Sequence, residues 1–298
     1  MKIIVLGGGA IGSLYGAKLS KLNDVVLVAR QRHADAINRH GLDIKGMENR
    51  TYRLKAAAKI EKIESNTLVL LTTKVNDSKK AVEGIKSLVK NDTIILCLQN
   101  GLYSEDIVKR IVGKRCIVLR AITNFGAVFL KPGVVEYRNY SYTSIEKSEK
   151  SKEMADNFKG CGLNGHVSKN IKLDMWKKLI LNCVLNPITA ILRIENGGIA
   201  DQRLNPLKKL TVDECLWVAK KDGIAFDFDF VNYIDEAIKG STNISSMQQD
   251  LIKGKRTEID HLNGAVIKLG KKYGIECPAN EAIVEIIKGM EKQNMFRD

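Results

Sequence analysis

The chain has 298 residues, 44% of them hydrophobic and 28% charged, with a formal net charge of +14 at pH 7. This length exceeds the size at which one hydrophobic core usually keeps growing, so we expect two domains. The apolar runs fall short of the roughly 18 residues that a membrane-spanning helix needs, and the N-terminus lacks the pattern of a signal peptide. We therefore expect a cytoplasmic protein that does not bind membranes.

The charge pattern and the spacing of the cysteines indicate which ligands, disulfides and metal sites to expect. Basic and acidic residues interleave, as in residues 59–64 and 146–152, so the positive charge indicates either a solvated surface or attraction of phosphate-bearing ligands. The six cysteines show neither metal-ligand nor redox spacing. This spacing predicts reduced thiols and no metal site.

The first part of the chain alternates short β-branched runs with helical segments, which is typical of βαβ units and a parallel sheet. Strands are expected at residues 2–6, 25–29, 67–72, 93–98 and 116–122, and helices at residues 10–22, 32–40, 78–88 and 104–111. Residues 42–56 and 127–142 alternate in hydropathy around glycines. They predict antiparallel hairpins added to the edge of the sheet.

After residue 168 the strand signals end and helical periodicity takes over. Helices are expected at residues 173–194, 207–222, 229–239, 245–273 and 280–293. We therefore predict an α/β protein. A doubly wound, Rossmann-type domain at residues 1–168 is followed by an all-helical domain at residues 169–298, with residues 160–170 as the connection.

A glycine-rich segment follows the first expected strand and opens the first expected helix. It reads Gly7-Gly8-Gly9-Ala10-Ile11-Gly12 and contains G-x-G-x-x-G. Gly7 permits a tight turn, Gly9 lets backbone N–H groups approach a pyrophosphate, and Gly12 allows close packing of the helix on the strand. The segment predicts dinucleotide binding, because strand, glycines and helix stand in the required order.

The ends of the next strands bear on the choice of cofactor. NAD-binding domains usually place an acid after the second strand, but this chain has Arg30 and no acid from residue 28 to residue 33. A guanidinium suits the 2′-phosphate of NADP (NADPH), which we predict as cofactor, with Arg30 as a plain surface residue as the alternative. Lys74 and Asn100 follow the third and fourth strands, where open α/β sheets bind ligands, although either could simply cap a loop.

The helix expected at residues 173–194 is the most informative about chemistry. Lys178, Asn182 and Asn186 recur at i, i+4 and i+8, so they share one face of an otherwise apolar helix. Such a polar row costs free energy unless it lines a site or finds partners, although the asparagines could also cap a neighbouring loop. Pro187, directly after the row, is expected to distort the helix.

A second polar cluster lies at residues 242–250 and continues to residues 257–260. Ser245 and Gln248 match a capping box, so we expect a long helix to start here. Asn243 and Ser246 lie near its N-terminus, which could hold a carboxylate, and Glu258 is expected on the same helix just over three turns later. The alternatives are a purely capping serine and a glutamate in an exposed salt bridge.

Together these motifs resemble the ketopantoate reductase family (2-dehydropantoate 2-reductase) over essentially the whole chain. The resemblance rests on the glycine segment, Gln99-Asn100-Gly101, Trp176-Lys177-Lys178-Leu179, Asn196-Gly197, Asn243-Ile244-Ser245-Ser246-Met247 and Thr257-Glu258-Ile259-Asp260. It implies a helical domain like the C-terminal domain of 6-phosphogluconate dehydrogenase. It also implies NADPH-dependent reduction of ketopantoate to (R)-pantoate, a step of pantothenate and coenzyme A biosynthesis.

The resemblance further implies roles for single residues. Lys178 would be the general acid, and Glu258 would bind the substrate hydroxyl and also contact the cofactor. Arg30 and Lys74 match cofactor positions of the family, and Asn100 would contact both cofactor and substrate. The remaining substrate-binding residues would be Asn182, Asn186, Asn196, Asn243 and Ser246.

Other functions stay open at this point. A related oxidoreductase of another 2-keto or 3-hydroxy acid would keep Lys178 and differ in what Glu258 and Asn243 contact. A non-catalytic sensor of NADP would not need Lys178 and Glu258 together. We expect no nucleic-acid partner, because no recognised binding module is evident. The expected partners are a small keto acid and, as an open question, a second copy of the chain in a homodimer.

Overall fold

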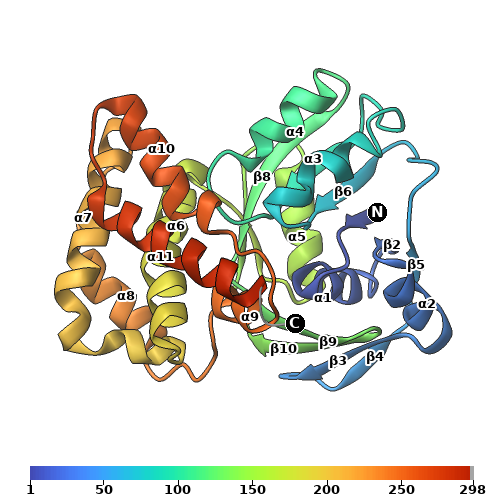
Figure 1. Cartoon of the computed structure of the whole chain (residues 1–298). Helices are drawn as coiled ribbons and strands as arrows, with labels where there is room; N and C mark the ends of the chain where they lie inside the picture. The colour runs from blue at the N-terminus through green and yellow to red at the C-terminus, as the bar shows by residue number, and fades with distance from the viewer. Residues whose placement is uncertain (296–298) are drawn as a thin grey trace. The chain divides into compact units, whose positions relative to one another are not determined.

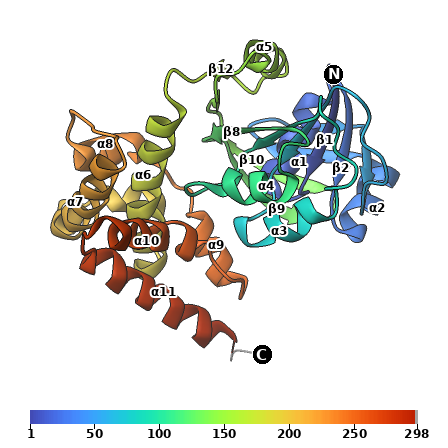
Figure 2. The same cartoon turned by 90° about the horizontal axis from the view of Figure 1, so that it is seen from above.

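The computed structural model describes residues 1–295, and the chain divides into two compact units, Met1–Ile171 and Lys172–Asp298. The boundary expected from the sequence, after residue 168, lies just before this division. Figures 1 and 2 show the strands and helices of each unit from two directions. Each unit is described by itself below.

The first unit is built on an eight-stranded sheet in the order β12-β11-β8-β7-β6-β1-β2-β5. Its strands are β1 (Lys2–Leu6), β2 (Asp24–Val28), β5 (Lys55–Ala57), β6 (Thr67–Leu71), β7 (Ile94–Cys97), β8 (Ile117–Thr123), β11 (Thr143–Ile145) and β12 (Gly165–Val167). The strands from β8 to β5 pair in parallel, whereas β11 is antiparallel to β8. β6 is buried at all its positions, because a parallel sheet is covered on both faces.

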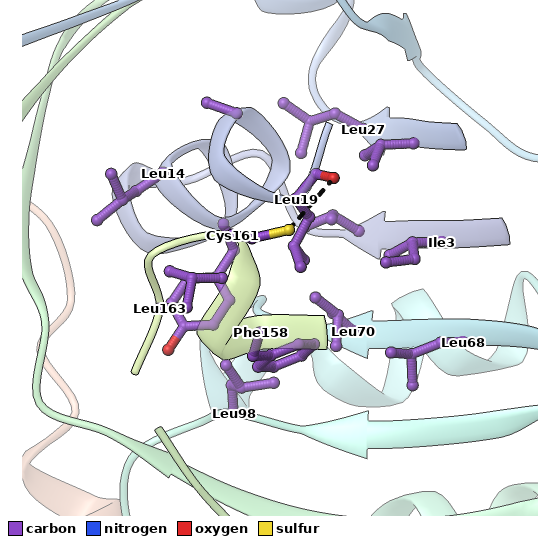
Figure 3. Close-up of a cluster of buried hydrophobic side chains, with 14 of the residues drawn as sticks. Ile3, Leu14, Leu19, Leu27, Leu68, Leu70, Leu98, Phe158, Cys161 and Leu163 are labelled. Carbon is purple, nitrogen blue, oxygen red and sulfur yellow. Dashed lines mark hydrogen bonds between the residues drawn. The ribbon is translucent and has the colours of Figure 1, made fainter. Parts of the chain in front are cut away.

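Helices cover the two faces of this sheet. They are α1 (Ala10–Leu19), α2 (Gln31–His40), α3 (Val75–Glu83), α4 (Ser104–Val112) and α5 (Ser151–Gly160). On one face, Leu19 of α1 and Phe158 of α5 pack over Leu70 of β6, as the close-up in Figure 3 shows. On the other face, α3 and α4 contribute Val82 and Val108 to a second cluster. α5 was not expected from the sequence, yet it completes the first of these two cores.

The two predicted hairpins exist, but the expectation that they extend the edge of the main sheet is wrong. β3 (Leu42–Gly46) pairs antiparallel with β4 (Arg50–Tyr52), and β9 (Gly126–Lys131) pairs antiparallel with β10 (Val134–Asn139). β10 also pairs in parallel with β3, which gives a separate sheet in the order β4-β3-β10-β9. This small sheet packs on α1, whose residues from Gly12 to Leu19 are all buried, because α1 lies between two sheets.

Helices account for the regular structure of the second unit as far as Met295. They are α6 (Ile171–Leu192), α7 (Asn205–Lys221), α8 (Phe230–Ile238), α9 (Ser246–Ile252), α10 (Asn263–Tyr273) and α11 (Pro278–Met295), with the short 3-10 helices η1 (Asn196–Ala200), η2 (Gln202–Leu204) and η3 (Ile259–His261). The single helix expected at residues 245–273 is wrong. α9 ends at Ile252, and Gly254 then adopts a φ of +60°, a conformation that favours glycine and ends the helix.

An aspartate whose side chain is 8% exposed links helices of the second unit at one end. Asp222, directly after α7, accepts hydrogen bonds from Trp176 Nε1 on α6 (2.9 Å) and from the Tyr273 hydroxyl on α10 (2.9 Å). Trp176 is fully buried, so this motif residue serves the fold. The predicted fold class is confirmed, with a Rossmann-type α/β unit followed by a helical unit. Within residues 1–295, none of the helices has both the length and the hydropathy to cross a membrane.

Candidate active site

The predicted cofactor-side residues follow four adjacent strands of the first unit. The glycine segment comes after β1, Arg30 after β2, Lys74 after β6 and Asn100 after β7. These strands are neighbours in the order β7-β6-β1-β2 and run parallel, so their carboxyl ends lie along one edge. The structure thus brings these residues to the place where open α/β sheets bind ligands.

The glycine segment combines a tightly packed turn with an open face. A Cβ on Gly7, whose φ is +126°, would lie 2.6 Å from the backbone nitrogen of Thr73, and a Cβ on Gly12 would lie 1.9 Å from the carbonyl oxygen of Gly7. A Cβ on Gly8 would come 2.3 Å from the Cβ of Ala29. A Cβ on Gly9, by contrast, would meet nothing within 4 Å. The backbone at Gly7, Gly8 and Gly12 is therefore packed closely against neighbouring atoms, whereas the space next to Gly9 is open.

The helix that starts at this open face favours an anion. α1 begins at Ala10 and has no acidic residue in its first turn. The first N–H groups of a helix have no partner within the helix, and the helix dipole is positive at this end. Ala10, Ile11 and Gly12 supply such N–H groups, so the segment fits the pyrophosphate of a dinucleotide.

Arg30 stands exposed at the N-terminus of α2. None of the residues from Ala29 to His33 is acidic. The next carboxylate, that of Asp35, accepts a hydrogen bond from Gln31 (2.8 Å). A cation without a neighbouring acid in its own segment is suited to a phosphate group. This arrangement lacks the carboxylate that would bind the ribose hydroxyls of NAD.

His33 links α1 to the small sheet, a role that the sequence did not reveal. The N–H of Gly133, in the β9–β10 turn, donates to His33 Nδ1 (2.9 Å), so Nε2 carries the proton and donates to Ser13 Oγ on α1 (3.0 Å). Burial lowers the pKa of His33 below its ordinary value. The neutral imidazole therefore joins α1, α2 and the small sheet.

The loop that carries Asn100 is held by Arg120 on β8, which sequence reasoning also missed. The side chain of Arg120 is 3% exposed, and its Nη2 donates to the carbonyl oxygens of Gln99 and Gly101, the residues on either side of Asn100. The distance to Gly101 is 2.9 Å. The guanidinium thereby fixes both peptides next to Asn100. No local sequence pattern predicts that an arginine on a buried strand binds the backbone of a neighbouring loop.

The same network reaches the loop of Lys74. Gln99 is buried, and its Nε2 donates to the carbonyl oxygen of Thr73 at 2.9 Å and to the Ser78 hydroxyl on α3. Thr73 directly precedes Lys74. The positions of Lys74 and Asn100 are therefore coupled through one buried amide.

In the second unit, α6 carries the predicted polar row. Asn182 and Asn186 are 8% and 6% exposed, and Lys178 is half-buried. The neighbouring Lys177 faces another way, with its Nζ 4.3 Å from the centre of the Tyr233 ring and 5.4 Å from that of Phe228. Successive residues of a helix are separated by about 100°, so the two lysines have different surroundings.

Asn196 and Asn243 are brought together through their backbones. The N–H of Asn196 donates to the carbonyl oxygen of Asn243 (2.7 Å). Ser245 caps α9 by accepting from the Gln248 N–H (3.3 Å), as the capping box predicted, and its hydroxyl donates to the carbonyl oxygen of Asn186 (3.3 Å). The segment before α9 is thus bound to α6 and to η1, while Ser246 is exposed as the first residue of α9.

Glu258 does not lie on the helix of Ser246, contrary to the expectation. It is half-buried in the residues between α9 and η3, and its carbonyl oxygen accepts from the N–H groups that close η3. The N–H of Thr257 donates to Glu291 of α11 (2.7 Å), and Asp260 forms an ion pair with Lys288 of α11 (2.8 Å). Glu258 therefore lies in a separate turn, and residues before and after it, Thr257 and Asp260, are bound to α11.

The fold and these residues define the class of the protein, an oxidoreductase with an NAD(P)-binding fold and a helical second unit. In the part of the chain that the structure describes, no group of three His, Cys, Asp or Glu side chains could hold a metal ion. The model of the family "Ketopantoate reductase PanE/ApbA" matches residues 3–150, and that of its C-terminal part matches residues 170–291. The chain belongs to the ketopantoate reductase family, as its motifs predicted.

Relatives and solved structures agree with this family. The 2-dehydropantoate 2-reductase of Pyrococcus horikoshii is 37% identical over 299 residues, which cover 98% of each chain. The solved structure of a ketopantoate reductase from Ralstonia eutropha has a TM-score of 0.92 at 28% identity and covers 99% of this chain and 100% of that chain. D-mandelate dehydrogenase, solved with NADH and anilino(oxo)acetate, has a TM-score of 0.89 at 29% identity over 99% of each chain.

Proposed function

We propose that this chain reduces ketopantoate to (R)-pantoate with NADPH, as a step toward pantothenate and coenzyme A. The observation that carries the proposal is the row of Lys178, Asn182 and Asn186 on α6, which places amides and an ammonium among buried apolar residues. Polar groups in such surroundings cost free energy unless they serve a ligand or find partners. Membership of the ketopantoate reductase family supports the reaction.

The proposed chemistry divides between two side chains. When bound, the reduced nicotinamide supplies the hydride for the keto carbon. The ammonium of Lys178 stabilises the negative charge that develops on the keto oxygen and gives it a proton. The carboxylate of Glu258 accepts a hydrogen bond from the substrate hydroxyl, and Asn182 and Asn186 orient the keto acid. Further substrate contacts come from Asn100, Asn196, Asn243 and Ser246.

The proposed cofactor contacts follow the strand ends of the first unit. The backbone of residues 7–12 binds the pyrophosphate, as the open face at Gly9 allows. Arg30 binds the 2′-phosphate, which is the basis for NADPH rather than NADH. Lys74 and Asn100 contact the remainder of the cofactor, and Glu258 is proposed as an additional contact. The cytoplasm as location stays a prediction, and the homodimer stays an open question.

A second candidate function is the reduction of an aromatic 2-keto acid. The likeness to D-mandelate dehydrogenase favours it, because that enzyme has the same fold over nearly the whole chain and was solved with NADH. Such an activity would use Lys178 in the same way. It would not need the proposed contact of Glu258 with a substrate hydroxyl, because the corresponding keto acid has no hydroxyl group.

Oxidation of NADPH and of NADH by the purified chain, followed by absorbance, distinguishes these functions. Three substrates are compared: ketopantoate, 3,3-dimethyl-2-oxobutanoate, which has the same carbon skeleton without the hydroxyl, and 2-oxo-2-phenylacetate, the keto acid of mandelate. We expect the highest kcat/KM for ketopantoate with NADPH. A preference for the phenyl compound would support the second function, and no turnover of any keto acid would refute both.

A further inference from the structure

Pro187 interrupts the hydrogen bonding of α6 directly after the polar row. Proline has no N–H, so the carbonyl oxygen of Cys183, four residues earlier, lacks its helical donor. α6 nevertheless continues to Leu192. Side chains donate to three carbonyl oxygens of this turn: Asn263 Nδ2 to Cys183 (3.0 Å), Thr189 Oγ1 to Leu185 (2.7 Å) and Ser245 Oγ to Asn186 (3.3 Å).

Asn263 joins this turn of α6 to the segment of Glu258. The carbonyl oxygen of Glu258 accepts from the N–H groups of His261 (2.9 Å) and Leu262 (3.1 Å), and α10 starts with the next residue, Asn263. One short turn therefore connects the Glu258 backbone to the amide that binds Cys183. The Asn263 amide thus donates to the carbonyl oxygen that a backbone N–H at position 187 would otherwise bind.

The Asn263 amide is held in one orientation by a buried network. Asn263 is fully buried, and its Nδ2 also donates to Asn280 Oδ1 (2.9 Å). Asn280 Nδ2 donates to Glu214 Oε2 on α7 (2.6 Å), and the Glu214 carboxylate accepts from the N–H groups of Ala279 (2.8 Å) and Asn280 (3.0 Å). Both N–H groups of the Asn263 amide are thus paired, whereas its buried Oδ1 has no hydrogen-bond partner among residues 1–295. A rotation of the amide by 180° would place this oxygen against the oxygens of Cys183 and Asn280, so the observed orientation is favoured. The donor of Asn263 is therefore fixed toward α6.

We propose that Asn263 is a positioning residue, which sets the Glu258 turn on the helix that bears Lys178 by supplying the hydrogen bond that Pro187 removes. The part that concerns Glu258 rests on the proposed function. The hydrogen-bond coupling between Asn263 and Pro187 does not. Asn263 itself contacts neither substrate nor cofactor in this scheme.

A double-mutant cycle between Asn263→Leu and Pro187→Ala tests the proposal. Pro187→Ala restores a backbone N–H for the Cys183 carbonyl oxygen, so the amide of Asn263 is no longer needed there. Asn263→Leu removes the donor to Asn280 Oδ1 in both backgrounds, but it leaves the Cys183 carbonyl oxygen unpaired only while Pro187 is present. With Pro187 present, it should lower kcat/KM for ketopantoate about tenfold, the scale of a buried acceptor left unpaired. In the Pro187→Ala background, the loss should be about threefold or less, because contacting residues are not additive.

A comparison of two substrates distinguishes a role of Asn263 in positioning Glu258 from a general loosening of α10. The loss caused by Asn263→Leu should be small for 3,3-dimethyl-2-oxobutanoate, which has no hydroxyl for Glu258. Val266→Ala is the matched control, since Val266 is fully buried on the same helix and its truncation loosens α10 without removing the amide. Val266→Ala should lower the Tm and leave the ratio of kcat/KM for the two substrates unchanged.

Several outcomes would overturn the proposal. Equal losses of kcat/KM for both substrates, or the same fold-loss with Pro187 and in the Pro187→Ala background, would make Asn263 a purely structural residue. If the unaltered chain does not reduce ketopantoate, the proposed function fails, and the cycle is read by urea unfolding instead. Coupled effects on unfolding then support the bond between Asn263 and the Pro187 turn, and additive effects refute it. Folding of Asn263→Leu only together with Pro187→Ala would also support it.

Discussion

Replacement of Lys178 by alanine is the most direct test of the proposed chemistry. Alanine keeps the helix propensity of α6, so the change removes the ammonium with little effect on the backbone. Loss of a general acid typically costs between 10²- and 10⁴-fold in rate, which corresponds to roughly 2.7–5.4 kcal/mol in the activation barrier. We expect kcat for ketopantoate to fall on this scale. Binding of NADPH, measured by fluorescence, should persist, because the proposed phosphate contacts lie in the first unit.

Lys177→Ala is the internal control for this experiment. The Lys177 ammonium lies over the Tyr233 ring, and loss of such a cation–π contact costs about 0.5–1 kcal/mol of stability at an exposed site. Urea unfolding should detect this small loss, while kcat stays near that of the unaltered chain. Near-normal turnover of Lys178→Ala, or a severe loss of turnover in Lys177→Ala, would refute the proposed face of α6 and the mechanism that depends on it.

Four further predictions concern single residues. Arg30→Ala should raise KM for NADPH and hardly change KM for NADH, which lacks the 2′-phosphate; equal increases for both would remove Arg30 from the cofactor site. Glu258→Ala should lower turnover of ketopantoate far more than that of 3,3-dimethyl-2-oxobutanoate, and an unchanged ratio would refute the proposed contact between Glu258 and the substrate hydroxyl. Because the pKa of folded His33 is lowered from 6.5, the unfolded chain binds a proton that the folded chain does not. The free energy of unfolding should therefore fall as the pH drops below 6.5, and His33→Gln should reduce this slope in urea titrations; an unaltered slope would contradict it. Arg120→Met should destabilise the chain by roughly 3–5 kcal/mol, because the buried carboxylate of Glu105, which lies 3.4 Å from the guanidinium, loses its partner. The same change should weaken NADPH binding, and unaltered binding would restrict Arg120 to the fold.

The sequence predicts well which residues lie at the carboxyl edge of the sheet, because the signals are local. The glycine segment needs only a strand before it and a helix after it, and the structure supplies both at β1 and α1. Arg30, Lys74 and Asn100 follow strands whose apolar runs are easy to find. The parallel order of these strands then brings the residues to one edge. The row on α6 is likewise visible as a repeat of four residues.

The missed features depend on contacts between distant segments. The helical pattern at residues 245–273 continues across the break, and the signal that could have divided it is Gly254, which has positive φ. The pairing of β10 with β3 is not visible in either hairpin alone. The burial of Arg120 and of Asn263 follows from the elements packed around them, and their polar side chains look like surface residues in a single sequence.

The small sheet on α1 determines when the first unit can fold during synthesis. Its parallel pairing joins Asp43 to Val134, and α5, which completes the core beneath α1, follows later still. A nascent chain that already contains the glycine segment therefore leaves one side of α1 uncovered until β9 and β10 have emerged. Such non-local pairing slows folding and exposes apolar surface to chaperones and proteases. Chains truncated before β9 should be degraded rapidly, although they contain the glycine segment, Arg30, Lys74 and Asn100.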